Sequence, residues 1–387
     1  MAKLGDVCDI LNGFAFKSEQ YVNDGIRIIR IANVQKGYVE DSTPVFYPID
    51  SKDAKKYSLE EDDILMSLTG NVGRVAKLSK EFLPAALNQR VACLRIKDGI
   101  ALDKAFLFNL LNSDYFEQQC IAASKGVAQK NMSTEWLKEY EIPMFSMEQQ
   151  KASASVLDKV TELITLRKEQ LAKLDQLVKS RFIELFGDCL TNPKGWKTKH
   201  LEDVAEVGSS KRVFVEELKE AGVPFYRGTE VGALAEGKPI KPELFITEEH
   251  YAELCEATGT PRIGDLLMPS ICPDGRIWVV NSDEPFYFKD GRVLWVHNID
   301  ASYNSIFLLY TLKDRIMTDY SSIASGTTFA ELKIFALKKC RIFDVPLAMQ
   351  NEFAAFIEQT DKSKVAIQQS LDKLETLKKS LMQEYFG

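Results

Sequence analysis

The segment Leu171–Gly187, LAKLDQLVKSRFIELFG, is repeated 200 residues later as Leu371–Gly387, LDKLETLKKSLMQEYFG. Nine of the 17 aligned positions are identical, and both copies end in Phe-Gly. Repetition at a fixed distance is the sequence signature of a duplicated architecture. The chain of 387 residues is therefore predicted to contain two copies of one architecture.

Shorter matches precede this repeat at similar offsets. In chain order they pair Leu4–Val7 with Leu201–Val204, Gly25–Arg30 with Gly222–Arg227, Asp63–Met66 with Asp265–Met268, Gly73–Val75 with Gly275–Ile277, and Arg90-Val91 with Arg292-Val293. Similarity is high in the closing part of each half and low elsewhere. We interpret this as two copies that kept one segment alike and diverged in the other.

Each closing segment is predicted to be a long helix. Ser146 and Gln149 have the spacing of a capping box, and Pro143 blocks an earlier start. No Pro or Gly interrupts the pattern before Gly187, and this glycine and Gly387 suit the residue that follows a helix. A helix of about 40 residues reaches about 60 Å.

Apolar residues recur along both helices at alternating spacings of three and four, which indicates the seam of a coiled coil. The seam residues are Leu157, Val160, Ile164, Leu171, Leu174, Val178 and Leu185 in the first copy and Ile357, Ile367, Leu371, Leu374 and Leu381 in the second. A single such helix could pack on its own domain. Two copies that end alike favour packing of one helix against the other.

The opening part of each half is predicted to be a mixed α/β domain. Runs rich in β-branched residues predict strands at Ile26–Ile31 and Val91–Ile96, with counterparts at Arg276–Val280 and Val293–His297. Asn192–Trp196 is a turn cluster between the halves. The predicted organisation is a globular domain at 1–145, a helix at 146–187, a linker at 188–198, a second globular domain at 199–346 and a second helix at 347–387.

The composition is that of a globular protein, with 45% apolar and 27% charged residues. The seven cysteines are scattered and form no C-x-x-C pair, so neither a zinc site nor a disulfide framework is expected. The N-terminus lacks the apolar stretch of a signal peptide, and the longest apolar run, near Ile306–Leu309, is too short to span a bilayer. A cytoplasmic protein without a membrane partner is expected.

The formal net charge of −7 weighs against DNA binding, because affinity for DNA depends on Lys and Arg placed against phosphates. A total does not describe one face of a protein, however. The segment from Asp63 to Lys97 carries six Lys and Arg against two acidic residues, whereas the comparable stretch from Arg262 to Asp300 is not basic.

The order of several short motifs resembles the specificity subunits of type I restriction-modification systems, over essentially the whole chain. They are Asn12–Lys17 (NGFAFK), Gly25–Arg30 as a strand that continues to Asn33, a D-I-L-M-S strand before the loop Gly70–Gly73, Asn88-Gln89-Arg90, Glu148-Gln149-Gln150 after a proline, Asn192-Pro193 with Trp196, and the closing Phe-Gly repeat. In the second half, Cys272–Gly275 replaces the G-x-x-G loop and Lys289–Arg292 replaces the N-Q-R element.

The resemblance implies an α+β protein with two target recognition domains, each followed by a long helix. It implies that the two helices pack as an antiparallel coiled coil with pseudo-two-fold symmetry. Each domain would then read one half of an asymmetric bipartite DNA target, and the helical pair would fix the spacing of the halves and dock methyltransferase subunits. The chain itself would not be an enzyme.

Side chains that hydrogen-bond base edges or hold phosphates are chiefly Arg, Lys, Asn, Gln, Ser and Thr. In the first domain the candidates are Lys17, Lys36, Thr69, Asn71, Arg74, Asn88, Gln89, Arg90, Lys125, Gln129, Lys130 and Asn131. In the second they are Lys211, Arg212, Arg227, Ser270, Arg276, Lys289, Arg292, Ser325, Thr327 and Thr328.

The expected partners are double-stranded DNA, two methyltransferase subunits and restriction–translocation subunits. No cofactor is expected in this chain, because S-adenosylmethionine, ATP and Mg²⁺ would be bound by the partners. No catalytic residue and no metal ligand is predicted.

Two alternatives belong to other classes. An enzyme is disfavoured because the sequence has no P-loop and no N/D-P-P-aromatic element, and Asp274 lies far from Glu331 for a nuclease pattern. The second alternative is a duplicated coiled-coil scaffold with two domains that bind a ligand other than DNA. A salt titration separates it from a DNA reader, because neutralising Z phosphates gives a slope of about −0.9Z in log K against log salt.

Overall fold

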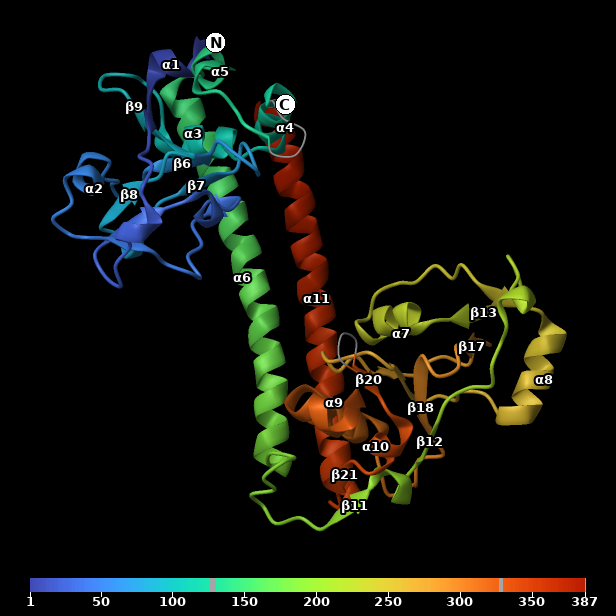
Figure 1. Ribbon diagram of the computed structural model, residues 1–387. Coiled ribbons are helices and arrows are strands. Elements are labelled where there is room, and N and C mark those ends of the chain that lie inside the picture. Colours follow the sequence, from blue (N-terminus) through green and yellow to red (C-terminus); the bar gives the residue numbers. More distant parts are fainter. Residues whose placement is uncertain (125–129, 327–329, 387) are drawn as a thin grey trace. The chain divides into compact units, whose positions relative to one another are not determined.

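The computed structural model describes residues 1–124, 130–326 and 330–386. The chain forms two compact units, one of Met1–Glu169 with Gln368–Gly387 and one of Gln170–Ile367. The two long helices, α6 (Met147–Phe186) and α11 (Leu347–Phe386), each contribute residues to both units (Figure 1). We call the part before α6 the first lobe and the part between α6 and α11 the second lobe.

The first lobe is built on two small sheets. One has the strand order β2-β9-β6-β7-β4 and the other the order β5-β3-β8. The first sheet consists of β2 (Cys8–Asn12), β9 (Val91–Ile96), β6 (Ile64–Ser67), β7 (Val75–Lys77) and β4 (Gly37–Tyr38). The second consists of β5 (Phe46–Tyr47), β3 (Ile26–Ile29) and β8 (Ala85–Leu87). The other elements are the two-stranded β1-β10 (Ala2–Lys3, Glu141–Ile142) and helices α1 (Leu4–Val7), α2 (Lys52–Lys56), α3 (Lys104–Leu111), α4 (Asp114–Ala123) and α5 (Thr134–Glu139).

The second lobe repeats this topology, except that among the described residues its larger sheet has four strands and no counterpart of β4. Its sheets have the orders β12-β18-β15-β16 and β14-β13-β17. The larger sheet consists of β12 (Glu206–Gly208), β18 (Val293–His297), β15 (Leu266–Pro269) and β16 (Trp278–Val279). The smaller one consists of β14 (Phe245–Ile246), β13 (Val223–Tyr226) and β17 (Tyr287–Phe288). Also present are β11-β21 (Thr198–His200, Arg341–Phe343), β19-β20 (Ala324–Ser325, Glu331–Leu332), α7 (Gly228–Ala235), α8 (Glu248–Thr258), α9 (Ser305–Ile323) and α10 (Ile334–Lys338). The duplication predicted from the sequence is therefore present in the fold.

The first turn of each long helix contains a buried glutamine, Gln150 or Gln350, whose side-chain amide makes corresponding hydrogen bonds in the two helices. Gln150 Oε1 accepts from the Asp103 N–H at 2.8 Å, and its Nε2 donates to the Phe145 carbonyl at 2.8 Å. Gln350 repeats this arrangement with the Asn304 N–H. Both side chains are fully buried and hydrogen-bonded, as buried polar groups require. The predicted capping box is also present, because Ser146 N–H donates to Gln149 Oε1 at 3.1 Å and Gln149 N–H donates to Ser146 Oγ at 3.3 Å.

Within each unit, segments of α6 and α11 run side by side in opposite directions (Figure 1). In unit 1 Lys168 pairs with Glu375 at 2.9 Å, while the earlier Leu157 lies in one core with the later Phe386. In unit 2 Asp175 pairs with Lys364, and the later Arg181 pairs with the earlier Glu352, so the helices are antiparallel there as well. All twelve predicted seam residues are buried or half-buried.

Two predicted strands differ from the structure. The strand expected to run on to Asn33 ends at Ile29, because the side chain of Asn33 accepts the Arg30 N–H at 2.8 Å and so caps a 3₁₀ turn at Ile31–Asn33. The strand expected at Arg276–Val280 is limited to Trp278–Val279. The turn at 192–196 is present, with the Gly195 N–H bonded to the Asn192 carbonyl at 3.0 Å.

Phe186, fully buried, packs edge-on against Phe307 of α9 and Phe353 of α11 in the core of unit 2. Phe186→Ala is expected to lower the free energy of unfolding by about 3–5 kcal/mol, because it leaves a cavity among these rings. Urea denaturation followed by tryptophan fluorescence measures this loss. Ile183→Ala, at an exposed position three residues earlier, is the control, and an equal loss in both variants would contradict the packing described here.

The described residues contain no group of three or more His, Cys, Asp or Glu that could hold a metal ion. All seven cysteines are free thiols, and burial raises the pKa of the Cys8 thiol to about 12. In the described ranges, no helix is both long and apolar enough to cross a membrane.

Candidate nucleic-acid interface

The glycine loop between β6 and β7 has a backbone geometry that favours glycine. Gly70 has φ +70° and Gly73 φ +81°, and a Cβ at Gly73 would lie 2.7 Å from the Cβ of Cys120 in α4. The loop presents the exposed Asn71 outward, and Arg74 Nη1 donates to Gln35 Oε1 at 2.8 Å.

Three candidate loops of the first lobe meet at one junction. The Leu68 N–H donates to the Arg90 carbonyl at 3.0 Å, and the Met132 N–H donates to the Leu68 carbonyl at 2.9 Å. The Gly70 N–H donates to the Lys130 carbonyl at 2.9 Å, and Thr69 forms an antiparallel bridge with Asn131. The structure therefore brings together loops that lie about sixty residues apart in the sequence.

The N-Q-R element lies beside the opening motif of the chain. The Gln89 N–H donates to the Phe14 carbonyl at 3.0 Å, and a Cβ at Gly13 would clash with the Leu87 carbonyl at 2.2 Å. Asn88 Oδ1 accepts the Arg90 N–H at 3.3 Å. The side chains of Gln89 and Arg90 are exposed, as a contact with DNA requires.

The second lobe repeats the junction with the same backbone hydrogen bonds. The Ser270 N–H donates to the Arg292 carbonyl at 2.9 Å, and the Leu332 N–H donates to the Ser270 carbonyl at 2.7 Å. Ser270 corresponds to Leu68 and is only 2% exposed. The side chain of Ser270 is buried at the end of a strand, so this structure does not expose it for the predicted contact with DNA.

The other candidates of the second lobe fall into two groups. Lys211, Arg212, Lys289 and Ser325 are exposed, and the guanidinium of Arg212 lies 5.3 Å from the ring centre of Phe214. Arg227, Arg276 and Arg292 are each paired with carboxylates of the same lobe. Four candidates lie outside the described residues: Lys125, Gln129, Thr327 and Thr328.

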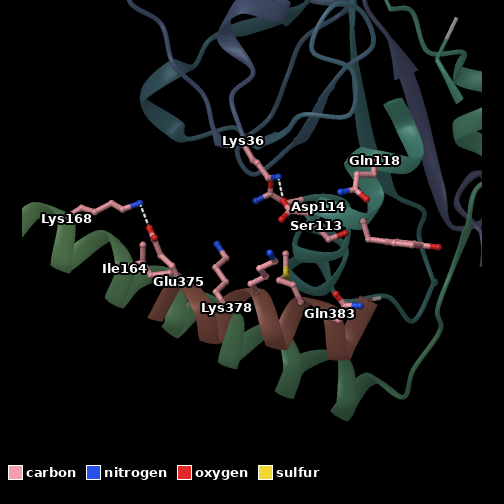
Figure 2. Close-up of a pocket in the computed structure, with 13 residues that line it drawn as sticks. Lys36, Ser113, Asp114, Gln118, Ile164, Lys168, Glu375, Lys378 and Gln383 are labelled. Atoms are coloured by element: carbon pink, nitrogen blue, oxygen red, sulfur yellow. Dashed lines mark hydrogen bonds and ion pairs between the residues drawn. The ribbon is translucent and has the colours of Figure 1, made fainter. Parts of the chain in front are cut away.

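Lys17 and Lys36, two lysines among the candidates of the first lobe, have different surroundings. The side chain of Lys17 is exposed. Lys36 lies at a cavity of about 700 Å³ in unit 1, where its Nζ is 2.5 Å from Asp114 Oδ1 and 2.7 Å from Glu117 Oε2 (Figure 2). A phosphate at Lys36 would have to displace two carboxylates.

Comparison with known proteins completes this description. A family model, described as the type I restriction modification DNA specificity domain, matches residues 1–176 and 193–379. The chain belongs to this family. Curated relatives of the chain are named as specificity subunits of type I restriction enzymes.

Individual members of the specificity-subunit family are distant in sequence. The MjaVIII specificity subunit of Methanocaldococcus jannaschii is 31% identical over 186 residues, which cover 46% of this chain and only 43% of the relative. The MjaIX specificity subunit of the same organism is 25% identical over 360 residues, covering 86% of this chain and 79% of the relative. The crystal structure of a type I system S subunit from M. genitalium matches with a TM-score of 0.60 at 16% identity, covering 100% of this chain and 95% of that one, and so shares its fold.

Sequence reasoning missed the acidic residues of this specificity subunit's second lobe. Glu230 and Glu331 contact the candidate arginines Arg227 and Arg292. Alignment of the two copies could have identified these glutamates. They occupy the positions of Asn33 and Asn131 in the first lobe, at offsets of 197 and 200.

Proposed function

We propose that this chain is the subunit that gives a type I restriction-modification complex its DNA sequence specificity. Each lobe reads one half of an asymmetric bipartite target in double-stranded DNA. The observation that carries the proposal is the junction that both lobes build with the same backbone hydrogen bonds, which has an arginine in each lobe, Arg90 and Arg292. The duplicated scaffold with another ligand remains the alternative, and it does not account for the exposed Asn71, Gln89 and Arg90 gathered around one loop.

In this proposal the residues 146–187 and 347–387 form the spacer and 188–198 the linker between recognition domains at 1–145 and 199–346. The spacer is an antiparallel coiled coil with pseudo-two-fold symmetry, and its length sets the gap between the half-sites. Successive major-groove faces on one side of DNA are about 34 Å apart, a distance that a helix of this length spans.

The partners follow from the same proposal. Two methyltransferase subunits bind the helical pair, and restriction–translocation subunits join for cleavage. S-adenosylmethionine, ATP and Mg²⁺ belong to these partners. A subunit that directs modification of the chromosome acts in the cytoplasm.

Deletion of the gene in the host, followed by mapping of methylated bases, tests this function. A bipartite asymmetric motif with a fixed gap should lose its methylation in the deletion strain and regain it on complementation. Unchanged methylation at every motif would contradict the proposal and favour the scaffold.

An exposed apolar row on α6 supports docking of the methyltransferase. Val156 and Leu163 are 41% and 43% exposed, and their spacing of seven residues places them on one side of the helix. Replacing both with Lys is expected to reduce co-purification of the methyltransferase at least about tenfold, because each lysine places an unpaired charge in an apolar interface.

The control for this docking test introduces the same two charges elsewhere on α6. Thr165→Lys with Gln176→Lys changes two exposed neutral residues of the helix. It should leave co-purification near the wild-type level. If both variants lost co-purification equally, or if neither lost it, the apolar row would be ruled out as the docking surface.

A further inference from the structure

Three arginines occupy corresponding positions in the two lobes. Arg30 and Arg227 each follow the central strand of the small sheet and cap the next helical turn. Arg74 and Arg276 each follow the glycine of the β6–β7 or β15–β16 loop. The backbone carbonyls of Arg90 and Arg292 accept corresponding hydrogen bonds at the two junctions, from the N–H groups of Leu68 and Ser270.

In the first lobe two of these arginines, Arg30 and Arg74, contact neutral groups. Arg30 Nη2 donates to the Thr43 carbonyl at 2.8 Å, and Arg74 Nη1 donates to Gln35 Oε1 at 2.8 Å. Within the residues that the structure describes, Arg90 has no side-chain ion pair. No described carboxylate therefore forms an ion pair with any of these three guanidinium groups.

In the second lobe each counterpart is held by carboxylates. Arg227 Nη2 lies 2.6 Å from Glu230 Oε1 and 3.1 Å from Glu243 Oε2. Burial raises the pKa of Glu230, but hydrogen bonds from Arg227 and Thr229 lower it to about 2, so this carboxylate stays ionised.

The other two arginines of the second lobe are held in the same way. Arg276 Nε lies 2.8 Å from Asp274 Oδ2, and its Nη1 lies 3.9 Å from Glu236 Oε1. Arg292 pairs with Glu331.

The charge difference extends over the lobes. Residues 1–145 contain 18 Lys and Arg against 20 Asp and Glu, whereas residues 199–346 contain 17 against 23. At two corresponding positions an amide in the first lobe, Asn33 or Asn131, is a glutamate in the second, Glu230 or Glu331. The Arg276–Asp274 and Arg292–Glu331 pairs are partly exposed, and such pairs contribute little to stability, so folding does not account for these two carboxylates.

We infer that the two lobes bind the DNA backbone unequally: the first supplies most of the phosphate-dependent affinity, and the carboxylates of the second hold its arginines away from phosphates. This inference rests on the proposed function. A phosphate that approaches Arg292 must compete with a carboxylate already in contact, and it meets the repulsion of that carboxylate until the pair opens. The acidic residues therefore lower the affinity of the second lobe for DNA that lacks its half-site.

The test uses the complex with its methyltransferase and two duplexes, one with the methylated motif and one with a scrambled sequence. Binding is measured between 50 and 200 mM KCl. The variant Glu243→Gln, Asp274→Asn, Glu331→Gln removes three exposed or half-exposed carboxylates and spares Glu230, which caps α7. It should bind the scrambled duplex about tenfold more tightly at the lowest salt, with a salt slope steeper by up to about 0.9 for each arginine that gains a phosphate.

The matched control is Glu220→Gln, Glu253→Gln, Glu256→Gln, which makes the same change in net charge at exposed glutamates of the second lobe. In the first lobe Arg90→Gln should reduce the slope, whereas Arg292→Gln in the otherwise unchanged chain should leave it within about 0.3 of the wild type. Equal effects of the two triple variants, or equal loss of slope from Arg90→Gln and Arg292→Gln, would overturn the inference. A wild-type complex that does not distinguish the motif from the scrambled duplex would instead overturn the proposed function.

Discussion

The helical pair is expected to come apart, and assembly with the methyltransferase to be lost, when lysine replaces four leucines together: Leu171, Leu174, Leu371 and Leu374. All four are buried or half-buried in their units. Four ammonium groups at seam positions lose water without gaining partners, and this opposes packing of each helix in its own unit. The far-UV circular dichroism signal should melt at a lower temperature than in the wild type, and co-purification should fall below detection.

The repeat supplies the control for this variant. Leu177 and Leu377 correspond to each other, and both are about half exposed on the outer side of their helices. Lysine at these two positions should leave the melting of the helices unchanged. A seam variant that melts like the wild type and still co-purifies with the methyltransferase at normal stoichiometry would contradict the spacer described above.

The second large effect is expected at the three-loop junction of the first lobe. Replacing Arg74 and Arg90 with Gln should weaken binding of the motif by roughly 1–3 kcal/mol for each side chain that reads a base edge, or about 5- to 150-fold. If a side chain holds a phosphate instead, the salt slope should fall by about 0.9 and binding of all sequences should weaken alike. Competition between the motif and duplexes with one changed base pair separates these outcomes.

Lys52→Gln is the control for the loop variant. Lys52 is an exposed lysine of α2, outside the three-loop junction. It should leave both affinity and discrimination close to the wild type. Unchanged affinity of the Arg74, Arg90 variant for the motif would remove the three-loop junction from the interface.

Long-range regularities made the helices and the duplication predictable. A 40-residue apolar pattern between a capping box at Ser146 and a glycine at Gly187 leaves few alternatives to a helix. The strand limits were less accurate, because the Asn33 amide caps a turn through a local hydrogen bond that competes with the extended conformation. Burial of Ser270 depends on tertiary packing that the residue type does not show.

The candidate loops were found by residue type, but their electrostatic partners were not. Arg292 and Glu331 are 39 residues apart, and Arg227 and Glu243 are 16 apart, so no local pattern joins them. Only the fold brings these side chains into contact. Comparison of the two copies is the one sequence signal that singles out Glu331, because Asn131 occupies its place in the first half.

The most direct test of the account is a chain in which residues 1–145 also replace residues 199–346, so that both long helices carry the first recognition domain. Co-purification with the methyltransferase checks that this chain assembles. The asymmetric methylated motif is expected to become an inverted repeat of the half-site read by the first domain, with the gap unchanged. Retention of the original second half-site by the assembled complex would contradict the claim that each lobe reads its own half.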